Sequence, residues 1–362
     1  MLKIVYLYSS LAITGGVERV LVDKTNYLVN HYDYDIYMIT SDQGQHLVPY
    51  QLDERVHLLD LQIRFHSQYR YHGWQRLKET RRLSRLYHQR LKEKLKEISP
   101  DMIVCTTSQN VHGLLQIKGK IPLVVECHVN FIHPDSWLQR ARTLYNNYWI
   151  GKADAVVTLT KGDAKNWKHV SHHVHIIPNI VHWNDTGRFS DCTAKRAIFV
   201  GRLVEQKGIP DLIEIWRIVN NRYPDWQLDV FGNGEMESIP GIKLFVHPPT
   251  ANVMEEYLNS SMLLMTSIYE PFGLVLPEAM SCGLPVVAFD CPYGPADIIT
   301  HESDGFLVQD RDINRYADYV CQLIESPGLR QTMGAAGIKT SQRYHADKIM
   351  PQWKQLFEHL IG

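Results

Sequence analysis

Short apolar runs alternate along this chain with segments whose apolar residues recur at helical spacing. The first run, residues 3–9, leads through Gly15-Gly16 into a helical pattern formed by Val17, Val20 and Leu28. Further apolar runs lie at 34–40, 56–61, 102–106, 123–127 and 155–159, and the longest helical stretch is 74–98. Because strands that alternate with helices are joined by crossover connections, this rhythm predicts a mainly parallel, doubly wound α/β sheet.

The alternation of predicted strands and helices is interrupted once and then resumes. Residues 174–193 lose helical periodicity and become polar, which indicates a linker near 180–193. Beyond it, apolar runs recur at 197–201, 227–231, 242–246, 262–266, 285–289 and 306–308, with helical patterns at 210–222, 250–259 and 276–282. We therefore predict two α/β domains, 1–180 and 181–362. The chain from 313 onward is predicted to be helical, and its last helix has an apolar face that includes Trp353 and Phe357.

Composition restricts the class of protein. The 362 residues are 44% hydrophobic and 21% charged, which is typical of a globular protein of two domains. A formal net charge of -1 argues against a general nucleic-acid binder. The six cysteines form no C-x-x-C pair and lie mostly in apolar runs, as expected of buried thiols in a reducing cytoplasm. The apolar run at 2–8 is too short for a signal peptide or a membrane span, so we expect a cytoplasmic protein.

A loop between two carboxylates follows one predicted strand of the second domain. Glu270-Pro271-Phe272-Gly273-Leu274-Val275-Leu276-Pro277-Glu278 joins the run at 262–267 to the helix at 276–282. The first amides of such a helix are unpaired and favour an anion, and Gly273 permits close approach to the backbone. Glu270 and Glu278 accept hydrogen bonds only, which suits the hydroxyls of a sugar attached to a phosphate. The alternative is structural, with Glu278 complementing the helix dipole and Glu270 solvated.

Two further loops follow predicted strands of the same sheet. The first, after 197–201, carries Arg202 and Lys207, and these two cations can meet a diphosphate. The second, 231–235, contains Gly232 and Gly234 and permits close approach of a ligand. Because the carboxyl ends of parallel strands meet at one edge, we expect all three loops to border one ligand site.

These motifs resemble family 4 of the glycosyltransferases, enzymes with the GT-B architecture of two facing Rossmann-like domains and an interdomain cleft. The resemblance covers almost the whole chain. It rests on Gly15-Gly16-Val17-Glu18-Arg19, Glu126-Cys127-His128, Ile177-Pro178-Asn179, Val200-Gly201-Arg202 with Lys207-Gly208, Phe231-Gly232-Asn233-Gly234-Glu235, Glu270 with Glu278, and Gly294-Pro295-Ala296-Asp297-Ile298-Ile299. It implies that the last helix, about 345–362, crosses back to the first domain, which would take the acceptor.

The resemblance also implies a role for each site residue. Arg202 and Lys207 would bind the donor diphosphate, together with the amides of Phe272, Gly273, Leu274 and Val275. Glu278 would bind the ribose and Glu270 the donor sugar. Gly15 and Gly16 would let the first-domain loop close over the phosphates, Gly232 would border the nucleotide, and His128 would lie beside the anomeric carbon. By itself, a histidine at a strand end is equally compatible with a structural role.

The chemistry implied is transfer of a sugar with retention of its anomeric configuration. Fixed cations and backbone dipoles would stabilise the charge that develops on the leaving diphosphate. No nucleophile placed like that of a retaining glycosidase is evident, so the leaving phosphate itself would help to deprotonate the acceptor. Arg202 and Lys207 already supply positive charge, so no metal or other cofactor is expected.

The chain departs from the family pattern near the expected nucleobase. The helix after the Gly232 loop is nearly absent, and His247 stands where a glycine is common. Asp297 stands where most members have a glutamate. These differences leave the identity of the base open.

The stretch 64–96 concentrates positive charge. It contains eleven Lys or Arg and two Glu, with Phe65, Tyr69, Tyr71, Trp74 and Tyr87 among them. Cations interleaved with aromatic residues suit the headgroup layer of an anionic membrane. The alternative is a solvated helix face whose leucines, Leu77, Leu83, Leu86, Leu91 and Leu95, point inward.

Together these features indicate a hexosyl- or N-acetylhexosaminyltransferase that uses a UDP-sugar. Its acceptor would be a glycan or lipid-linked glycan of lipopolysaccharide or capsule, at the inner face of the cytoplasmic membrane. One alternative is a sugar-nucleotide epimerase of the same architecture, which needs acid-base residues and no acceptor. The other is a catalytically silent subunit that binds the nucleotide sugar.

Overall fold

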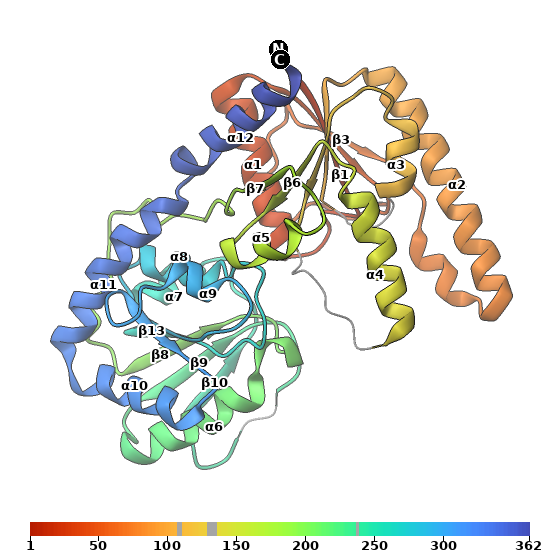
Figure 1. The fold of residues 1–362 in the computed structure, drawn as a ribbon. Coiled ribbons are helices and arrows are strands. Elements are labelled where there is room, and N and C mark those ends of the chain that lie inside the picture. The colour runs from red at the N-terminus through yellow and green to blue at the C-terminus, as the bar shows by residue number, and fades with distance from the viewer. Residues whose placement is uncertain (107–110, 129–135, 237–238) are drawn as a thin grey trace. The chain divides into compact units, whose positions relative to one another are not determined.

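The structure is a computed structural model that describes residues 1–106, 111–128, 136–236 and 239–362 (Figure 1). Its contacts divide the chain into two compact units. The N-terminal unit contains Met1–Leu159, Ala164–Ile180 and Ile349–Gly362, and the C-terminal unit contains Thr160–Asp163 and Val181–Lys348. Each unit is built around one parallel sheet, which confirms the doubly wound α/β class predicted from the alternating pattern.

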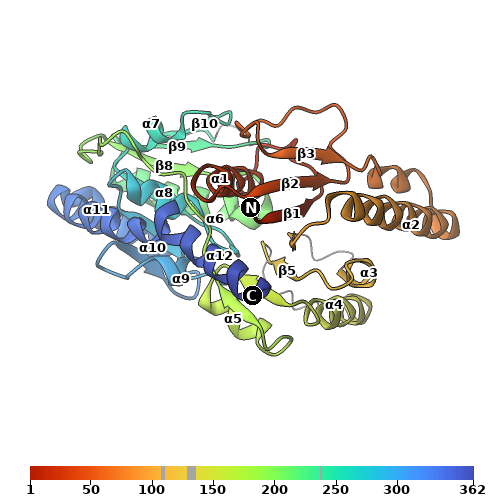
Figure 2. The ribbon, with the colours of Figure 1, turned by 90° about the horizontal axis from the view of Figure 1, so that it is seen from above.

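The N-terminal unit has a seven-stranded sheet in the order β3-β2-β1-β4-β5-β6-β7. Its elements are β1 (Lys3–Tyr8), α1 (Gly16–Tyr32), β2 (Asp35–Thr40), β3 (His57–Asp60), η1 (Phe65–Arg70), α2 (Gly73–Ile98), β4 (Met102–Cys105), α3 (Val111–Ile117), β5 (Leu123–Glu126), α4 (Trp137–Ile150), β6 (Ala155–Thr158), α5 (Lys161–Trp167) and β7 (Val174–Ile176). The residues of α12 (Ala346–Ile361) from Ile349 onward also belong to this unit. Figure 2 shows α1 and α12 on one side of this sheet and α2, α3 and α4 on the other.

The C-terminal unit has a six-stranded sheet in the order β10-β9-β8-β11-β12-β13. Its elements are β8 (Arg196–Val200), η2 (Glu205–Lys207), α6 (Ile209–Arg222), β9 (Gln227–Phe231), β10 (Leu244–His247), α7 (Val253–Leu258), β11 (Met262–Met265), α8 (Val275–Ser281), β12 (Val286–Phe289), α9 (Pro295–Ile298), β13 (Gly305–Val308), α10 (Ile313–Glu325), α11 (Pro327–Ser341) and η3 (Gln342–Tyr344). In this order β8 lies directly beside β11, although more than sixty residues separate their starts.

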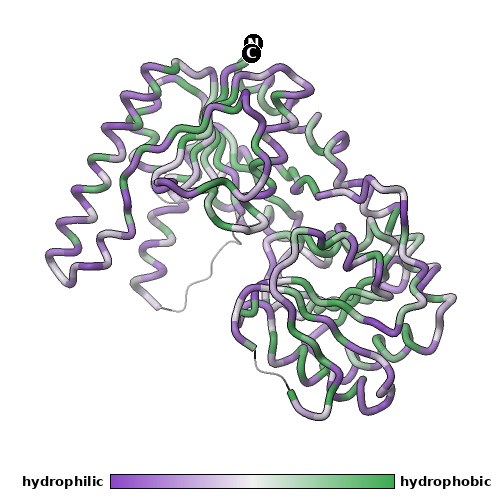
Figure 3. Tube along the Cα trace, turned by 180° about the vertical axis from the view of Figure 1, so that it is seen from behind, coloured by the Kyte–Doolittle hydropathy of each residue, from purple (hydrophilic) through white to green (hydrophobic). Residues whose placement is uncertain are grey.

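Both faces of each sheet are covered at its centre, so the central strands are apolar without alternation, whereas the edge strands β3, β7 and β10 are partly exposed. In β1, Ile4, Val5 and Tyr6 all have 0% exposure. Successive side chains of a strand point to opposite faces. Val5 therefore joins the cluster that includes Leu91 of α2, while Tyr6 faces α1, where the Lys24 ammonium lies over its ring. Figure 3 shows the same pattern, with hydrophobic strands inside each unit and a largely hydrophilic α2.

Several local predictions were wrong or incomplete. Residues 174–176, for which no strand was predicted, form β7 at the edge of the first sheet, because they pair with β6. The helical tail is interrupted at Ser326, whose side chain accepts a hydrogen bond from Leu329 N and so caps α11. The inward leucine face of the structural alternative for 64–96 is confirmed at Leu83, Leu91 and Leu95, which are buried, and is wrong at Leu77, which is 41% exposed.

Arg330 of α11 ties three segments of the C-terminal unit together. It is 3% exposed and donates to the carbonyl oxygens of Cys192, Leu323 and Ile324, at 2.9, 2.5 and 3.0 Å. Two of these carbonyls belong to the last turn of α10, where a cation is favoured by the helix dipole. Burial lowers the pKa of Arg330, but its guanidinium retains these acceptors and lies over the Trp226 ring.

The described residues contain no helix long and apolar enough to cross a membrane. The same residues contain no group of three or more His, Cys, Asp or Glu side chains placed to hold a metal ion. All six cysteines are free and buried, which confirms that they act as small apolar side chains.

Replacing Arg330 by methionine should destabilise the C-terminal unit. Arg330→Met keeps the apolar length of the side chain but leaves three buried carbonyls without their donor, so we expect a loss of about 3 kcal/mol in the free energy of unfolding. Urea unfolding followed by circular dichroism measures it. The exposed Arg217 of α6 provides the control, since Arg217→Met should change the free energy by less than about 0.5 kcal/mol. Equal effects of the two substitutions would contradict this role.

Candidate functional site

A lysine and a glutamate from adjacent strands meet at the carboxyl edge of the second sheet. Lys207 ends η2, which follows β8, and Glu270 lies five residues beyond β11. The Lys207 ammonium forms an ion pair with Glu270 Oε1, and the Ser267 hydroxyl donates to the same oxygen at 2.7 Å. The two side chains are 16% and 7% exposed. The structure therefore brings together two residues that sequence reasoning placed in separate loops.

The main chain around Glu270 is fixed on both sides. Its amide donates to Pro292 O at 2.8 Å, and its carbonyl accepts from the amides of Tyr293 and Gly294 at 2.8 and 3.1 Å. Through these bonds Glu270 forms an isolated parallel bridge with Tyr293 beyond the end of β12. The carboxylate is thus carried by a rigid segment of the sheet edge.

Arg311 supports the strand end that leads to this carboxylate. Its guanidinium donates to Ser267 O at 2.9 Å and to Thr266 O at 3.0 Å, forms an ion pair with Asp211, and lies over the Phe289 ring. Sequence reasoning missed both Arg311 and Ser267. Neither belongs to a motif whose residue types indicate chemistry, so the sequence carried no signal for them.

Arg202 differs from Lys207 because no carboxylate of the described residues pairs with it. It lies in the loop after β8, its side chain is exposed, and it makes no ion pair or side-chain hydrogen bond with another residue in the described part of the chain. A guanidinium held at a sheet edge without a carboxylate partner is available to an anionic ligand.

Gly232 is required by close packing of two loops. A Cβ at this position would lie 1.8 Å from Gly201 O, the residue that precedes Arg202. The loops are further joined by the hydrogen bond from Leu203 N to Asn233 O, at 2.7 Å. Gly232 therefore sets the position of the Arg202 loop, and any larger residue would displace it.

The segment 272–275 forms the turn into α8. Gly273 has a φ of +90°, a conformation that favours glycine, and Phe272 is buried against the Tyr344 ring. The helix begins at Val275, one residue before the predicted start, and Leu274 precedes it without a side-chain cap. The amides of Phe272, Gly273, Leu274 and Val275 make no hydrogen bond to another residue among those described.

Glu278 lies in the first turn of α8, in surroundings unlike those of Glu270. It is 8% exposed, and the hydroxyl of the fully buried Tyr257 of α7 donates to its Oε2 at 3.4 Å. The two carboxylates of this loop therefore carry different partners, a cation for Glu270 and a phenol for Glu278.

Gly15 and Gly16 stand at the start of α1 in the N-terminal unit. Gly15 is the N-cap, its carbonyl accepts from the Tyr50 hydroxyl at 3.1 Å, and a Cβ on it would lie 2.3 Å from Glu18 Oε2. Glu18 in turn accepts from the Tyr8 hydroxyl at 2.7 Å. Glu18 thus folds back over the turn, and Gly16 remains exposed beside it.

His128 lies two residues beyond β5 and is 7% exposed. Its Nε2 is 3.2 Å from Glu126 Oε1, an ion pair only when the ring is protonated, and neither ring nitrogen has a hydrogen-bond partner among the described residues. A buried ring nitrogen without a partner is costly unless a ligand supplies one. This arrangement favours a binding role for His128 over a purely structural one.

A buried lysine, Lys24, belongs to the same group as Glu126 and His128, and sequence reasoning missed it. Lys24 of α1 is 1% exposed, pairs with Glu126 Oε2, and lies 4.1 Å from the centre of the Trp353 ring of α12. Burial by itself would raise the pKa of Glu126, but the charges of Lys24 and His128 outweigh burial and lower that pKa to about 2. The available signal was the position of Lys24, four residues after Val20 and four before Leu28 on the apolar face of α1.

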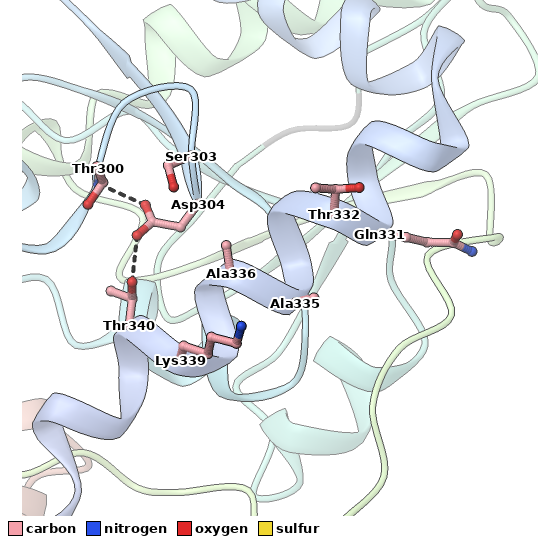
Figure 4. A pocket seen from close by; sticks show the side chains of 9 residues that line it. All are labelled: Thr300, Ser303, Asp304, Gln331, Thr332, Ala335, Ala336, Lys339 and Thr340. Atoms are coloured by element: carbon pink, nitrogen blue, oxygen red, sulfur yellow. Dashed lines mark hydrogen bonds between the residues drawn. The ribbon is translucent and has the colours of Figure 1, made fainter.

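Two further features lie apart from these groups. Asp297 accepts a hydrogen bond from the amide of Lys161 at the start of α5, so it has a structural partner within the C-terminal unit. A pocket of about 680 Å³ lies beside α11, and Figure 4 shows Asp304 in it, bonded to Thr300 N at 2.7 Å and Thr340 Oγ1 at 2.6 Å. None of the predicted site residues lines this pocket.

Comparison with known proteins identifies the family and the fold of the chain. The family described as "Glycosyltransferase Family 4" matches residues 14–183, and the family described as "Glycosyl transferases group 1" matches residues 188–340. The amylovoran biosynthesis glycosyltransferase AmsD of Erwinia amylovora is 28% identical over 98% of this chain and 99% of its own length.

Two solved structures share the fold of the whole chain. TarM of S. aureus, solved as a variant with fondaparinux, alpha-GlcNAc-glycerol and UDP, superposes with a TM-score of 0.80 at 16% identity, covering 99% of this chain and 100% of that one. HepE of Anabaena, solved with UDP-glucose, has a TM-score of 0.75 at 18% identity over 99% and 100% of the two chains. The chain belongs to family 4 of the glycosyltransferases, with the GT-B fold of two Rossmann-like units.

Proposed function

We propose that this glycosyltransferase moves a sugar from a UDP-sugar to a glycan or lipid-linked glycan of a cell-surface polysaccharide, with retention of anomeric configuration. A UDP donor is supported by the structures of HepE with UDP-glucose and of TarM with UDP. A surface-polysaccharide acceptor is supported by the name of AmsD, and by poly(ribitol-phosphate) alpha-N-acetylglucosaminyltransferase of Staphylococcus aureus, 27% identical over 64% of this chain.

The observation that carries the proposal is the Lys207–Glu270 ion pair at the same sheet edge as Arg202, which has no ion-pair partner among the described residues. Lys207 and Ser267 both contact Glu270 Oε1, and no described side chain contacts Oε2. Lys207 has two further N–H groups, and Arg202 has its whole guanidinium. A diphosphate placed against these cations would set the attached sugar next to Glu270 Oε2, which can accept a hydrogen bond from a sugar hydroxyl.

Each of the other site residues then has a proposed part. Glu278, held by the Tyr257 phenol, would accept from the ribose hydroxyls. The unpaired amides of Phe272, Gly273, Leu274 and Val275 would donate to the diphosphate. In the N-terminal unit, Gly15 and Gly16 would allow close approach of the donor phosphates, and His128 would offer Nδ1 to the donor sugar or the acceptor.

Catalysis would come mainly from electrostatics. As the bond from the anomeric carbon to the diphosphate breaks, negative charge grows on the leaving phosphate and positive charge on the sugar. Lys207 and Arg202 stabilise the first without reorganisation, because they are already in place. The leaving phosphate takes the acceptor proton on the same face of the sugar, so the product keeps the configuration of the donor. The positive charge of the two side chains would serve in place of a metal.

We also propose that the stretch 64–96 contacts an anionic membrane surface. Part of its charge is committed within the protein, since Arg82 pairs with Glu79, Lys94 pairs with Glu97, and Arg90 donates to the carbonyls of Leu61 and Gln62. Others are exposed without a carboxylate partner among the described residues: Arg70, Arg76, Lys78, Arg81 and Arg85. Transfer would then take place at the inner face of the membrane.

Replacing Lys207 by alanine should abolish most of the transfer. We expect kcat to fall about 100- to 1,000-fold, as when one preorganised donor to a developing charge is removed. The substrates are a panel of UDP-sugars with and without glycan acceptors, and NMR identifies the products. Lys243→Ala, which changes an exposed lysine of the same unit, is the control. An epimer formed from the donor alone, an inverted glycoside, or equal rates for Lys207→Ala and wild type would contradict the proposal.

The two carboxylates of the 270–278 loop should have separable effects. Glu278→Ala should raise the KM for the donor about tenfold with little change in kcat, since the ribose contact is the same in ground and transition states. Glu270→Ala should also lower kcat about 100-fold, because it removes both the sugar contact and the partner of Lys207. Steady-state kinetics at varied donor concentration separate the two parameters. Identical kinetic defects in the two variants would contradict these roles.

Membrane binding through α2 should be sensitive to salt. Each cation near an anionic surface contributes about 1 kcal/mol, so the α2 triple variant Arg76→Gln, Lys78→Gln, Arg81→Gln should bind phosphatidylglycerol-rich vesicles about 100-fold more weakly than wild type. Vesicle flotation at rising salt measures the affinity, which should fall as the Debye length shortens. Equal affinity for phosphatidylcholine vesicles would contradict the proposal.

A further inference from the structure

Helix α4 carries an apolar stripe that the N-terminal unit leaves uncovered. Trp137, Ala141, Leu144 and Tyr148 follow one another at the spacing of one helical face. Trp137 is 75% exposed, Leu144 70% and Tyr148 57%, and Ala141 is also exposed. A helix of a folded domain normally turns such a stripe toward the core. Here the stripe faces solvent along about three turns, which indicates an external partner.

Among the described residues, the contacts that fix α4 to the body of the unit lie in the last part of the helix. The Tyr145 hydroxyl lies 2.7 Å from His112 Nδ1 of α3, and the Trp149 ring stacks on the His112 ring at 4.0 Å. Among the described side chains of the helix, Asn147 and Ile150 are buried. The N-terminal half of α4 therefore extends beyond the described segments that pack against its last part.

The first half of α2 extends in the same way and in the same direction. Every residue of 73–78 is exposed, and the first buried residue of α2 is Leu83. Both helices follow a strand and return antiparallel to it, so both helix starts lie at the carboxyl edge of the sheet. Figures 1 and 2 show α3 lying between α2 and α4, with the two projecting ends on the same side of the unit.

The charges around the stripe indicate what kind of partner it contacts. Residues 136–152 contain Arg140, Arg142 and Lys152 and no Asp or Glu. The projecting half of α2 adds five Lys or Arg against Glu79, which is already paired with Arg82. Two copies of this surface would repel each other. A polyanionic glycan would match the charge but would leave Leu144 and Trp137 without apolar contact. An anionic bilayer satisfies both, because its headgroups are anionic and its interface is apolar just below.

We infer that the stripe Trp137–Ala141–Leu144–Tyr148 inserts into the interface of an anionic membrane, while the cations of α2 and α4 contact its headgroups. The inference rests on the membrane contact proposed for 64–96 and assigns the inserted element to a different helix. Tryptophan and tyrosine are the side chains that favour this interfacial depth. Because the stripe begins at the carboxyl edge of the sheet, it would bring the edge that carries Gly16 and His128 to the membrane, where a lipid-linked acceptor is held.

The test compares the double variant Leu144→Ser, Tyr148→Ser with the α2 triple variant. Both changed side chains are exposed, so the fold should be retained, and Phe245→Ser, which removes an exposed phenylalanine of the C-terminal unit, is the matched control. On phosphatidylglycerol-rich vesicles the double variant should lose at least about tenfold in affinity, and the loss should persist at high salt. Brominated lipids should quench a part of the tryptophan fluorescence that is absent in Trp137→Phe.

Each result decides between the hypotheses. If the double variant binds like wild type while the α2 triple variant does not, the stripe is not a lipid contact, and the α2 proposal alone remains. If wild type binds neither anionic nor neutral vesicles, both membrane proposals are wrong, whereas sugar transfer is tested separately by NMR. If wild type forms dimers without lipid and the double variant is a monomer in analytical ultracentrifugation, the stripe is a contact between copies. If Trp137 is not quenched by brominated lipid, insertion is excluded.

Discussion

The site depends on one constraint, the parallel pairing of every strand in each sheet. Parallel strands end at the same edge, so the loops that follow them meet there whatever their distance along the chain. In the C-terminal unit this places the loop after β8, with Arg202 and Lys207, directly beside the loop after β11, with Ser267 and Glu270. In the N-terminal unit it places Gly15-Gly16 and His128 at one edge. Helices cover both faces of each sheet, and the central strands are apolar because neither of their faces is solvated.

The Lys207–Glu270 pair positions a cation at this edge of the sheet before a ligand binds. Glu270 is fixed by three main-chain hydrogen bonds and by the Ser267 hydroxyl, and Arg311 supports the strand end before it. The carboxylate keeps the ammonium at the edge in the absence of a ligand. A diphosphate that arrives meets a cation whose position is already set, so little reorganisation accompanies the growth of charge on the leaving group. Arg202 has no such partner among the described residues, and it supplies the planar contact that a lysine cannot make.

The N-terminal unit contains a second, more deeply buried group of charges. Lys24 and Glu126 are almost fully enclosed, and removal of either would leave the other charge uncompensated, at a cost of about 3–5 kcal/mol. Their pairing keeps Glu126 ionised, since its pKa is lowered to about 2, and places a carboxylate 3.2 Å from His128 Nε2. The Trp353 ring of α12 closes over the Lys24 ammonium. The helix at the end of the chain thus supports a group at the edge of the sheet formed by its beginning.

The sequence by itself determined those features that depend on neighbouring residues. The alternation of apolar runs with helical spacing predicted two parallel sheets, and the loops with Gly232, Arg202, Glu270 and Glu278 were recognisable because glycine and charged residues at strand ends have a local chemical meaning. Tertiary structure decided which loops meet, since the placement of β8 beside β11 is a contact between distant segments. It also decided that Lys24 is buried with Glu126 and that the stripe on α4 is uncovered. A periodic pattern specifies which face of a helix is apolar, but only the packing of other segments determines whether that face is buried or left for a partner.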